Sequence, residues 1–235
     1  MKQAFRHTAA VVTLLCCGSA AAAPYPTEGQ LRTAIENVAK LLKAEGLDVE
    51  MFNAQTVGMT QPLLAAGLNL ENGACVVYYN RKPEDGLTQY FETITENNLP
   101  VLLNAMAVHE AAHCIERREA FVRKHFDKIL PPEFGPDGAT IQGYLSVIKS
   151  GALIKWGEVL ADIASLLYLK QAAPDQWVEL AKGLAGMRHD LASKWPEHDT
   201  SPWLYKIIAA DAKVSLNQSL FETAFQLRRQ HQPGG

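Results

Sequence analysis

The sequence has little of several features that would mark particular classes of protein. Its 22 lysine and arginine residues are outnumbered by 25 acidic residues, so the formal charge is −3 and there is no broad basic surface to hold a nucleic-acid backbone. With 12 prolines and 16 glycines among 235 residues, and no internal repeat, the chain is not of low complexity. Because 48% of the residues are apolar and 20% are charged, we expect a globular protein without a nucleic-acid partner.

The N-terminus has the three-part pattern of a secretory leader. Lys2 and Arg6 precede an apolar stretch, residues 8–23, which ends in small residues and is too short to span a bilayer. We therefore expect a signal peptide at 1–22 and a mature domain at 23–235, exported to the periplasm or secreted, with no stable membrane span. The alternative is a buried or membrane-anchoring apolar N-terminus.

Cysteine is scarce beyond the leader. Only Cys75 and Cys114 remain there, in a chain that we expect to enter an oxidising compartment. One disulfide between them and two buried free thiols are both open interpretations, because geometry decides and the sequence does not give it.

Hydrophobic periodicity indicates a single α+β domain. Thr27 and Gln30 form a capping-box pattern before a helical run that ends at Gly46. Short apolar runs then predict a small antiparallel sheet with a hairpin; they are residues 47–52, 63–70 and 74–79, with the turn at 71–73. Helical spacing returns and predicts a mainly helical body, with helices over 86–96, 100–129, 140–170, 174–195 and 202–229.

The most informative segment is His-Glu-Ala-Ala-His at 109–113, inside the helix expected from residue 100. Residues four apart share a helix face, so His109 and His113 can bind one metal ion while Glu110 lies beside it. Neutral imidazoles leave a zinc ion able to activate a water and polarise a peptide carbonyl. A neighbouring carboxylate would accept the proton of that water, and this is the role we expect for Glu110.

A catalytic zinc site commonly has three protein ligands, so a third ligand is needed. No third histidine follows within a few residues of His113. On the helix expected at 140–170, Glu158 and Asp162 are four residues apart among apolar neighbours. Glu158 can bind the metal while Asp162 orients a ligand histidine through its free ring nitrogen.

These two segments together resemble the gluzincin metallopeptidases, the thermolysin-like clan. The resemblance covers about residues 100–170 and implies a zincin-like fold and one zinc ion per chain. It implies His109, His113 and Glu158 as metal ligands, Glu110 as the general base and Asp162 as support. The distance between the motifs is longer than in thermolysin, which leaves residues 131–144 free to lie over the cleft and influence substrate access.

Gluzincins also place a further side chain near the developing oxyanion. His198, on a loop before a helix, is the preferred candidate, and His189 is the rival; either could become the third metal ligand if Glu158 does not bind. In this group an edge strand binds extended peptide by backbone pairing. Residues 75–79 are the candidate for that strand, equally readable as a plain core strand, and a disulfide from Cys75 to Cys114 would join it to the metal helix.

The sequence thus favours an exported zinc metallopeptidase, acting on a peptide or protein substrate through zinc-activated water. The alternative is a zincin fold kept as a metal-stabilised binding or assembly protein of the cell envelope without turnover. A helical domain that binds no metal is the third interpretation.

Overall fold

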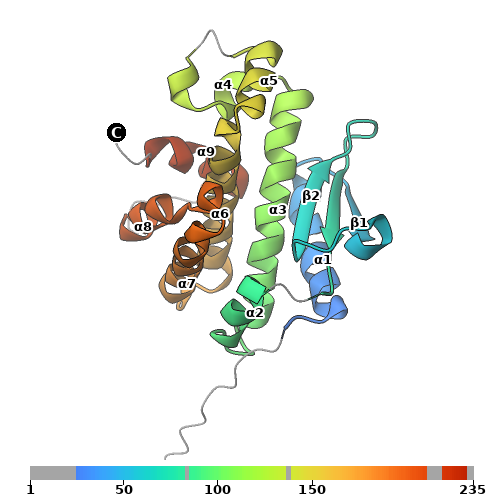
Figure 1. Ribbon diagram of the computed structural model, residues 1–235, viewed down its shortest axis with the longest axis vertical. Coiled ribbons are helices and arrows are strands. Elements are labelled where there is room, and N and C mark those ends of the chain that lie inside the picture. The colour runs from blue at the N-terminus through green and yellow to red at the C-terminus, as the bar shows by residue number, and fades with distance from the viewer. Residues whose placement is uncertain (1–24, 83–84, 136–138, 211–218, 232–235) are drawn as a thin grey trace, which may run out of the picture.

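Figure 1 shows the computed structural model, which describes residues 25–82, 85–135, 139–210 and 219–231. The structure is mostly helical with one small sheet near the N-terminal end, so the expected α+β class is confirmed. The signal peptide expected at 1–22 lies outside the described residues. Within the described ranges, none of the helices combines the length and apolarity that a membrane span requires.

Helix α1 (Glu28–Ala44) begins at the expected capping box. The Thr27 side chain accepts the N–H of Gln30, and the Gln30 side chain accepts the backbone N–H of Thr27 at 2.8 Å. These two bonds satisfy backbone donors that a helix start otherwise leaves unpaired. The apolar face of α1 packs on the sheet and on the central helix through Leu31, Ala34, Ile35, Val38 and Leu42.

The sheet contains β1 (Val49–Asn53), β2 (Leu64–Leu68) and β3 (Cys75–Tyr79), in the order β1-β3-β2. Strands β2 and β3 form the expected hairpin, whose turn includes Gly73 at φ +75°. Strand β1, however, pairs parallel to β3, so the expectation of a wholly antiparallel sheet is wrong. A tight turn dictates the direction of a hairpin locally, whereas the direction of β1 depends on a longer connection that leaves no local signature.

The long helices expected from periodicity are divided in the structure. The predicted helix 100–129 ends at Phe121 and a short helix follows, with Lys124 between them at φ +57°. The predicted helix 140–170 breaks at Gly151, which adopts φ +77°, a conformation that glycine reaches without steric cost. The helices are α2 (Asp85–Glu92), α3 (Leu99–Phe121), α4 (Phe126–Ile129), α5 (Ile141–Lys149), α6 (Ala152–Ala172), α7 (Trp177–Asp190), α8 (Ser201–Ala209) and α9 (Leu220–Gln230). Short 3-10 turns also occur at η1 (Ala54–Val57), η2 (Pro132–Phe134), η4 (Leu191–Ser193) and η5 (Pro196–His198).

The other two C-terminal predictions are also shortened. The helix expected at 174–195 is α7 followed by η4, and the helix expected at 202–229 corresponds to α8 and α9, with residues 211–218 between them outside the description. Apolar spacing continues across these interruptions, because both flanking helices bury one face against the same core.

Helix α3 runs through the middle of the molecule (Figure 1). The sheet and α1 lie on one side of it, and α6 to α9 lie on the other, while α4 and α5 lie near its C-terminal end. Helix α6 packs along α3 more extensively than any other element. Because α3 is enclosed from both sides, it buries residues all round its circumference rather than along a single stripe. Polar side chains on the α3–α6 boundary are therefore withdrawn from bulk water.

Candidate metal centre

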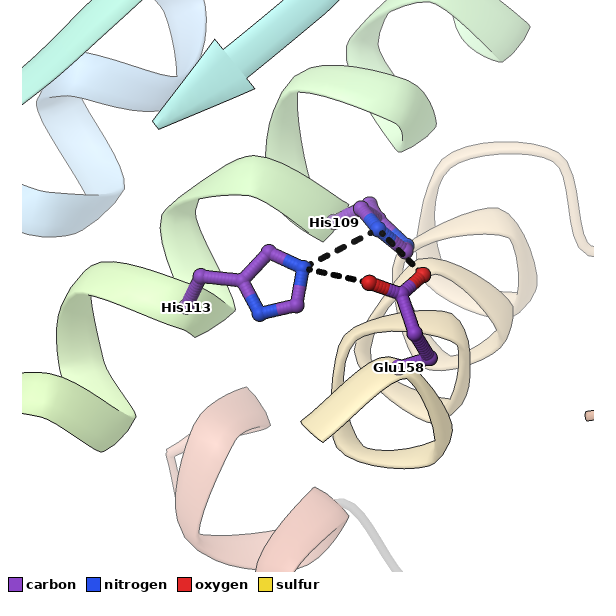
Figure 2. A group of neighbouring side chains, drawn as sticks. All are labelled: His109, His113 and Glu158. Atoms are coloured by element: carbon purple, nitrogen blue, oxygen red, sulfur yellow. Dashed lines mark hydrogen bonds and ion pairs between the residues drawn. The ribbon is translucent and has the colours of Figure 1, made fainter. Parts of the chain in front are cut away.

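Two histidines of α3 point toward α6, one helical turn apart. Their Nε2 atoms, on His109 and His113, lie 3.2 Å from each other, and the rings meet edge to face with centroids 4.9 Å apart. Figure 2 shows both rings turned toward the same carboxylate on α6. The helical spacing that the sequence predicted thus brings two ring nitrogens to one place.

That carboxylate belongs to Glu158. Its Oε2 lies 3.4 Å from Nε2 of His109, and its Oε1 lies 3.4 Å from Nε2 of His113. Three donors bound at about 2.1 Å to a tetrahedral zinc ion would be separated by about 3.4 Å. The two Nε2 atoms are 3.2 Å apart, and each lies 3.4 Å from its nearer Glu158 oxygen, which are separations of that size; two imidazoles and one carboxylate are also a donor set that zinc accepts.

Asp162, one turn after Glu158, holds the far side of His109. Its Oδ1 lies 2.8 Å from Nδ1 of His109, which leaves Nε2 facing the cluster. Arg188 of α7 donates to both oxygens of Asp162 at 2.8 Å and to Glu158 at 3.3 Å. Thr200 donates its hydroxyl to the same aspartate at 2.5 Å. The second carboxylate is therefore fully bonded, as a nearly solvent-free charge must be.

The charges of this group shift its protonation equilibria, and with no metal ion present they favour the protonated form of His109. Burial alone would lower the pKa of His109, but the negative charges of Asp162 and Glu158 outweigh it and raise that pKa to about 10. Burial would raise the pKa of Asp162, yet Arg188 and His109 lower it to about 2. The pKa of Glu158 is likewise held well below its ordinary range by His109, against the effect of burial. The two carboxylates stay ionised and favour positive charge between them.

Glu110 lies beside this group and lines the same cavity. Burial raises the pKa of its carboxyl group, and the positive charges of His109 and His113 only partly oppose that effect. A raised pKa makes a carboxylate a stronger proton acceptor.

His198, on η5, reaches the cluster, and its rival does not. Nδ1 of His198 lies 3.0 Å from Oε2 of Glu158, and the side chain is 35% exposed. His189 is exposed at the C-terminal turn of α7 and does not line the cavity, so the structure does not bring it to the cluster. Residues 195–198 come after the end of α7 and η4, where the chain can bend back toward the cleft.

A cavity of about 500 Å³ opens beside the three donors. Its polar wall holds His109, Glu110, His113, Glu158 and Asp162. Its apolar wall extends along α2, α3, α7 and η4; it includes Leu87, Tyr90, Leu102, Ala105, Met106, Leu184, Met187 and Leu191. Large apolar side chains can thus enter next to the candidate metal centre.

Strand β2, and not β3, forms the rim of this cavity. Strand β3 lies between β1 and β2, so of the two readings of residues 75–79 the core strand is the one observed. Leu63 accepts the N–H of Asn80, a bond directed at β3. Because antiparallel pairing alternates, the backbone groups of Leu64 and Ala66 face away from β3 and toward α3.

The expectation that residues 131–144 cover the cleft is wrong for the part described. None of the described residues in that segment lines the cavity, and α4 and α5 lie near the C-terminal end of α3 (Figure 1). Tyr144 instead packs edge to face on Phe121, with ring centroids 5.5 Å apart. The aromatic side chain of Tyr144 ties the segment to that end of the helix.

A disulfide joins Cys75 of β3 to Cys114 of α3, with Cα atoms 5.5 Å apart. Of the two interpretations left open by the sequence, the bonded pair is therefore the one found. Cys114 directly follows His113, so the bond anchors α3, the helix with both histidines, to the middle strand of the sheet.

Arg188 and Thr200 are the site residues that the sequence reasoning missed. A signal for Arg188 was present, because it lies four residues after Leu184 and seven after Ala181, on the buried face of α7. A cation on an apolar helix face requires a carboxylate partner, and Asp162 is that partner. Thr200 had no comparable signal.

Comparison of the chain with family models, with curated proteins and with solved structures gave no match.

Proposed function

We propose that this protein is an exported zinc metallopeptidase of gluzincin type, which hydrolyses peptide bonds. The observation that carries the proposal is the convergence of two imidazoles and one carboxylate, whose nearest ring-nitrogen and oxygen atoms lie 3.2 to 3.4 Å apart, beside Glu110 and an open cavity. His109, His113 and Glu158 would hold the zinc ion. Asp162 and Arg188 would keep His109 and Glu158 oriented toward it.

A bound zinc ion supplies Lewis acidity, which acidifies water and polarises a carbonyl. Glu110 accepts the proton of the attacking water and passes it to the leaving amine, a task suited by its raised pKa. His198 lies close enough to Glu158 to donate a hydrogen bond to the oxygen of a carbonyl held there. Together these roles give hydrolysis by direct attack of water on the peptide carbonyl, without a covalent intermediate on the protein.

Two further features support a peptide substrate. The outward backbone groups of Leu64 can pair with an extended chain, a mode that requires little sequence specificity. The apolar wall of the cavity can take a large apolar side chain next to the reacting bond. The disulfide supports export, because such bonds persist in oxidising compartments and are rare in the cytosol.

The first test is the zinc content of the purified protein, wild type beside Glu158→Ala. We expect about one zinc per chain in the wild type and a clear loss in the variant. If the folded wild type binds no zinc even when zinc is added, the proposal is wrong. The remaining interpretation is then a helical domain that binds no metal.

The second test separates the enzyme from a metal-stabilised binding protein. Casein cleavage should stop on addition of a chelator and return with zinc. Glu110→Gln should keep the zinc and lose about 10²- to 10⁴-fold in kcat, since it removes only the proton acceptor. Zinc binding without any turnover by the wild type would favour the binding protein, and full activity of Glu110→Gln would exclude the mechanism.

A further inference from the structure

Arg117 is a cation of the cavity wall that the proposed mechanism does not use. It lies four residues after His113, on the same face of α3, and its half-buried side chain lines the cavity. In the described part of the chain its guanidinium forms no ion pair with a carboxylate; its one recorded partner is the backbone oxygen of Ala66. The neighbouring Glu116 is already engaged by Arg228 at 2.6 Å.

The bond from Arg117 closes part of the free edge of β2. Ala66 directs its backbone groups away from β3, and its carbonyl accepts from Nη1 of Arg117. Leu64, whose backbone groups also face away from β3, lines the cavity, so an extended ligand bound along β2 there meets a guanidinium two residues further along the strand instead of a free carbonyl.

A guanidinium has five N–H donors, and Arg117 uses one of them in its bond to the carbonyl of Ala66 on β2. The remaining donors lie at a cavity wall where no carboxylate among the described residues pairs with them. A planar fork of this kind matches a carboxylate of the ligand, and the partly enclosed position strengthens the pairing relative to open water.

We propose that Arg117 forms a carboxylate-binding subsite at the end of the cleft. The subsite makes the enzyme selective for peptides that carry a negative charge two residues away from the peptide residue that pairs with Leu64. The inference rests on the proposed function. In a peptide antiparallel to β2, the residue facing Ala66 precedes the one facing Leu64, so the carboxylate is an acidic side chain on the N-terminal side of the peptide. In a parallel peptide that residue follows, so the carboxylate is the C-terminus.

The test is a series of fluorogenic peptides cleaved by the zinc-loaded protein. One set carries Glu or Gln at each of three positions before the scissile bond, and the other has a free or an amidated C-terminus. We expect kcat/KM to be about tenfold higher for the charged member of one set. Preference for Glu at one position identifies the side chain as the source, and preference for the free C-terminus identifies the chain end.

Variants tie the preference to this residue. In Arg117→Gln the charged and uncharged peptides should be cleaved equally, although glutamine can still donate to Ala66; in Arg117→Lys part of the preference should remain. Arg81→Gln removes the same charge from the protein surface, away from the cavity, and should keep the full preference. The proposal is overturned if the wild type does not distinguish charged from uncharged peptides, or if Arg117→Gln distinguishes them as well as the wild type does.

A failure of the proposed function gives a different result. If the zinc-loaded wild type cleaves none of the peptides, the enzyme proposal falls, and fluorescence anisotropy of the same labelled peptides then decides on the subsite. Binding about tenfold tighter for the charged peptides, lost in Arg117→Gln, supports it. Equal affinities overturn it.

Discussion

At Asp162 a single carboxylate accepts bonds from side chains of three different elements. His109 comes from α3, Arg188 from α7 and Thr200 from the turn before α8. Each bond restricts the aspartate, and the aspartate in turn restricts the ring of His109. The orientation of His109, a candidate metal ligand, is thus held by a residue outside the candidate donor set.

Replacing Asp162 by Asn tests this arrangement. The amide keeps the shape but loses the charge that supports His109, so we expect zinc affinity to fall about 10- to 100-fold, as measured by competition with a chelating dye. Asp48→Asn is a matched control, because Asp48 is exposed and pairs only with Lys43 at the surface. Unchanged affinity in Asp162→Asn would mean that Arg188 and Thr200 orient the site without the aspartate.

A second buried carboxylate, that of Glu119, lies near the C-terminal end of α3. It is fully buried and lies 2.7 Å from Arg123 and 2.8 Å from His125. Burial would raise its pKa, but the bond from His125 and the charges of Lys128 and Arg123 lower it below the ordinary value. Because the pKa of Glu119 is lower in the folded protein than in the unfolded chain, its ionised carboxylate stabilises the fold at pH values above the unfolded pKa of about 4.3. That stabilisation is lost as the pH falls through the pKa of the folded state.

We therefore expect Glu119→Gln to lower the free energy of unfolding by about 1–3 kcal/mol at pH 7, measured by urea denaturation. The difference from wild type should shrink as the pH is lowered below about 4. Glu222→Gln, at an exposed partner of Lys128, should change stability much less. A difference that stays constant from pH 7 to pH 3 would contradict the assignment.

The parts of the site that the sequence predicts are those carried on single helices. His109 with His113, and Glu158 with Asp162, follow from the rule that residues four apart share a helix face. That these two pairs face each other, and that Arg188 joins them, depends on how α3, α6 and α7 pack. Packing of separate helices has no local signature, so Arg188 could be suspected only as a charge on an apolar face.

At the scale of elements, the approach of α6 to α3 depends on the absence of a side chain at Gly157. A Cβ there would lie 3.0 Å from Oε2 of Glu116 and 3.9 Å from Nδ1 of His113. Glu116 cannot easily move away, because Arg228 holds its other oxygen at 2.6 Å. The next residue along α6 is Glu158, so any separation of the two helices also displaces a candidate metal ligand.

Gly157→Ala and Gly183→Ala form a matched pair for this prediction. Both positions lie inside helices, but a Cβ at Gly183 meets nothing within 4 Å. Alanine at 183 should raise the free energy of unfolding by up to about 1 kcal/mol through helix propensity alone. Gly157→Ala should not gain this stability and should bind zinc more weakly. If Gly157→Ala is stabilised and keeps its zinc affinity, a Cβ fits between α3 and α6 and the prediction is wrong.

The direction of β1 illustrates the limit of element-level prediction. Alternating and apolar runs locate all three strands, and the turn before β3 predicts the hairpin. The pairing of β1 with β3 joins residues about 26 positions apart, from Val49 to Cys75, and nothing in either run specifies a parallel partner. Hydrophobic periodicity also fails to reveal helix breaks such as the one at Gly151, because the apolar face continues in the helices before and after it.

For the whole molecule, the disulfide is the covalent tie between the sheet and the central helix. It closes a loop with a sequence separation of 39 residues. In the chain-entropy description, a loop of this size stabilises the folded state by about 4 kcal/mol. The double variant Cys75→Ser with Cys114→Ser should therefore unfold at a markedly lower temperature in calorimetry, and the reduced wild type should behave similarly. Equal melting temperatures would exclude a stabilising role.

The division of ligands along the chain has a consequence for assembly from fragments. Residues up to the Pro131–Gly135 turn supply both histidines, Glu110 and the disulfide, while the residues after it supply Glu158, Arg188 and His198. A cut in that turn, remote from the cavity, would leave each fragment with an incomplete set of donors. Two such polypeptides should recombine more tightly with zinc than without it, because the ion would then join them as a molecular clasp.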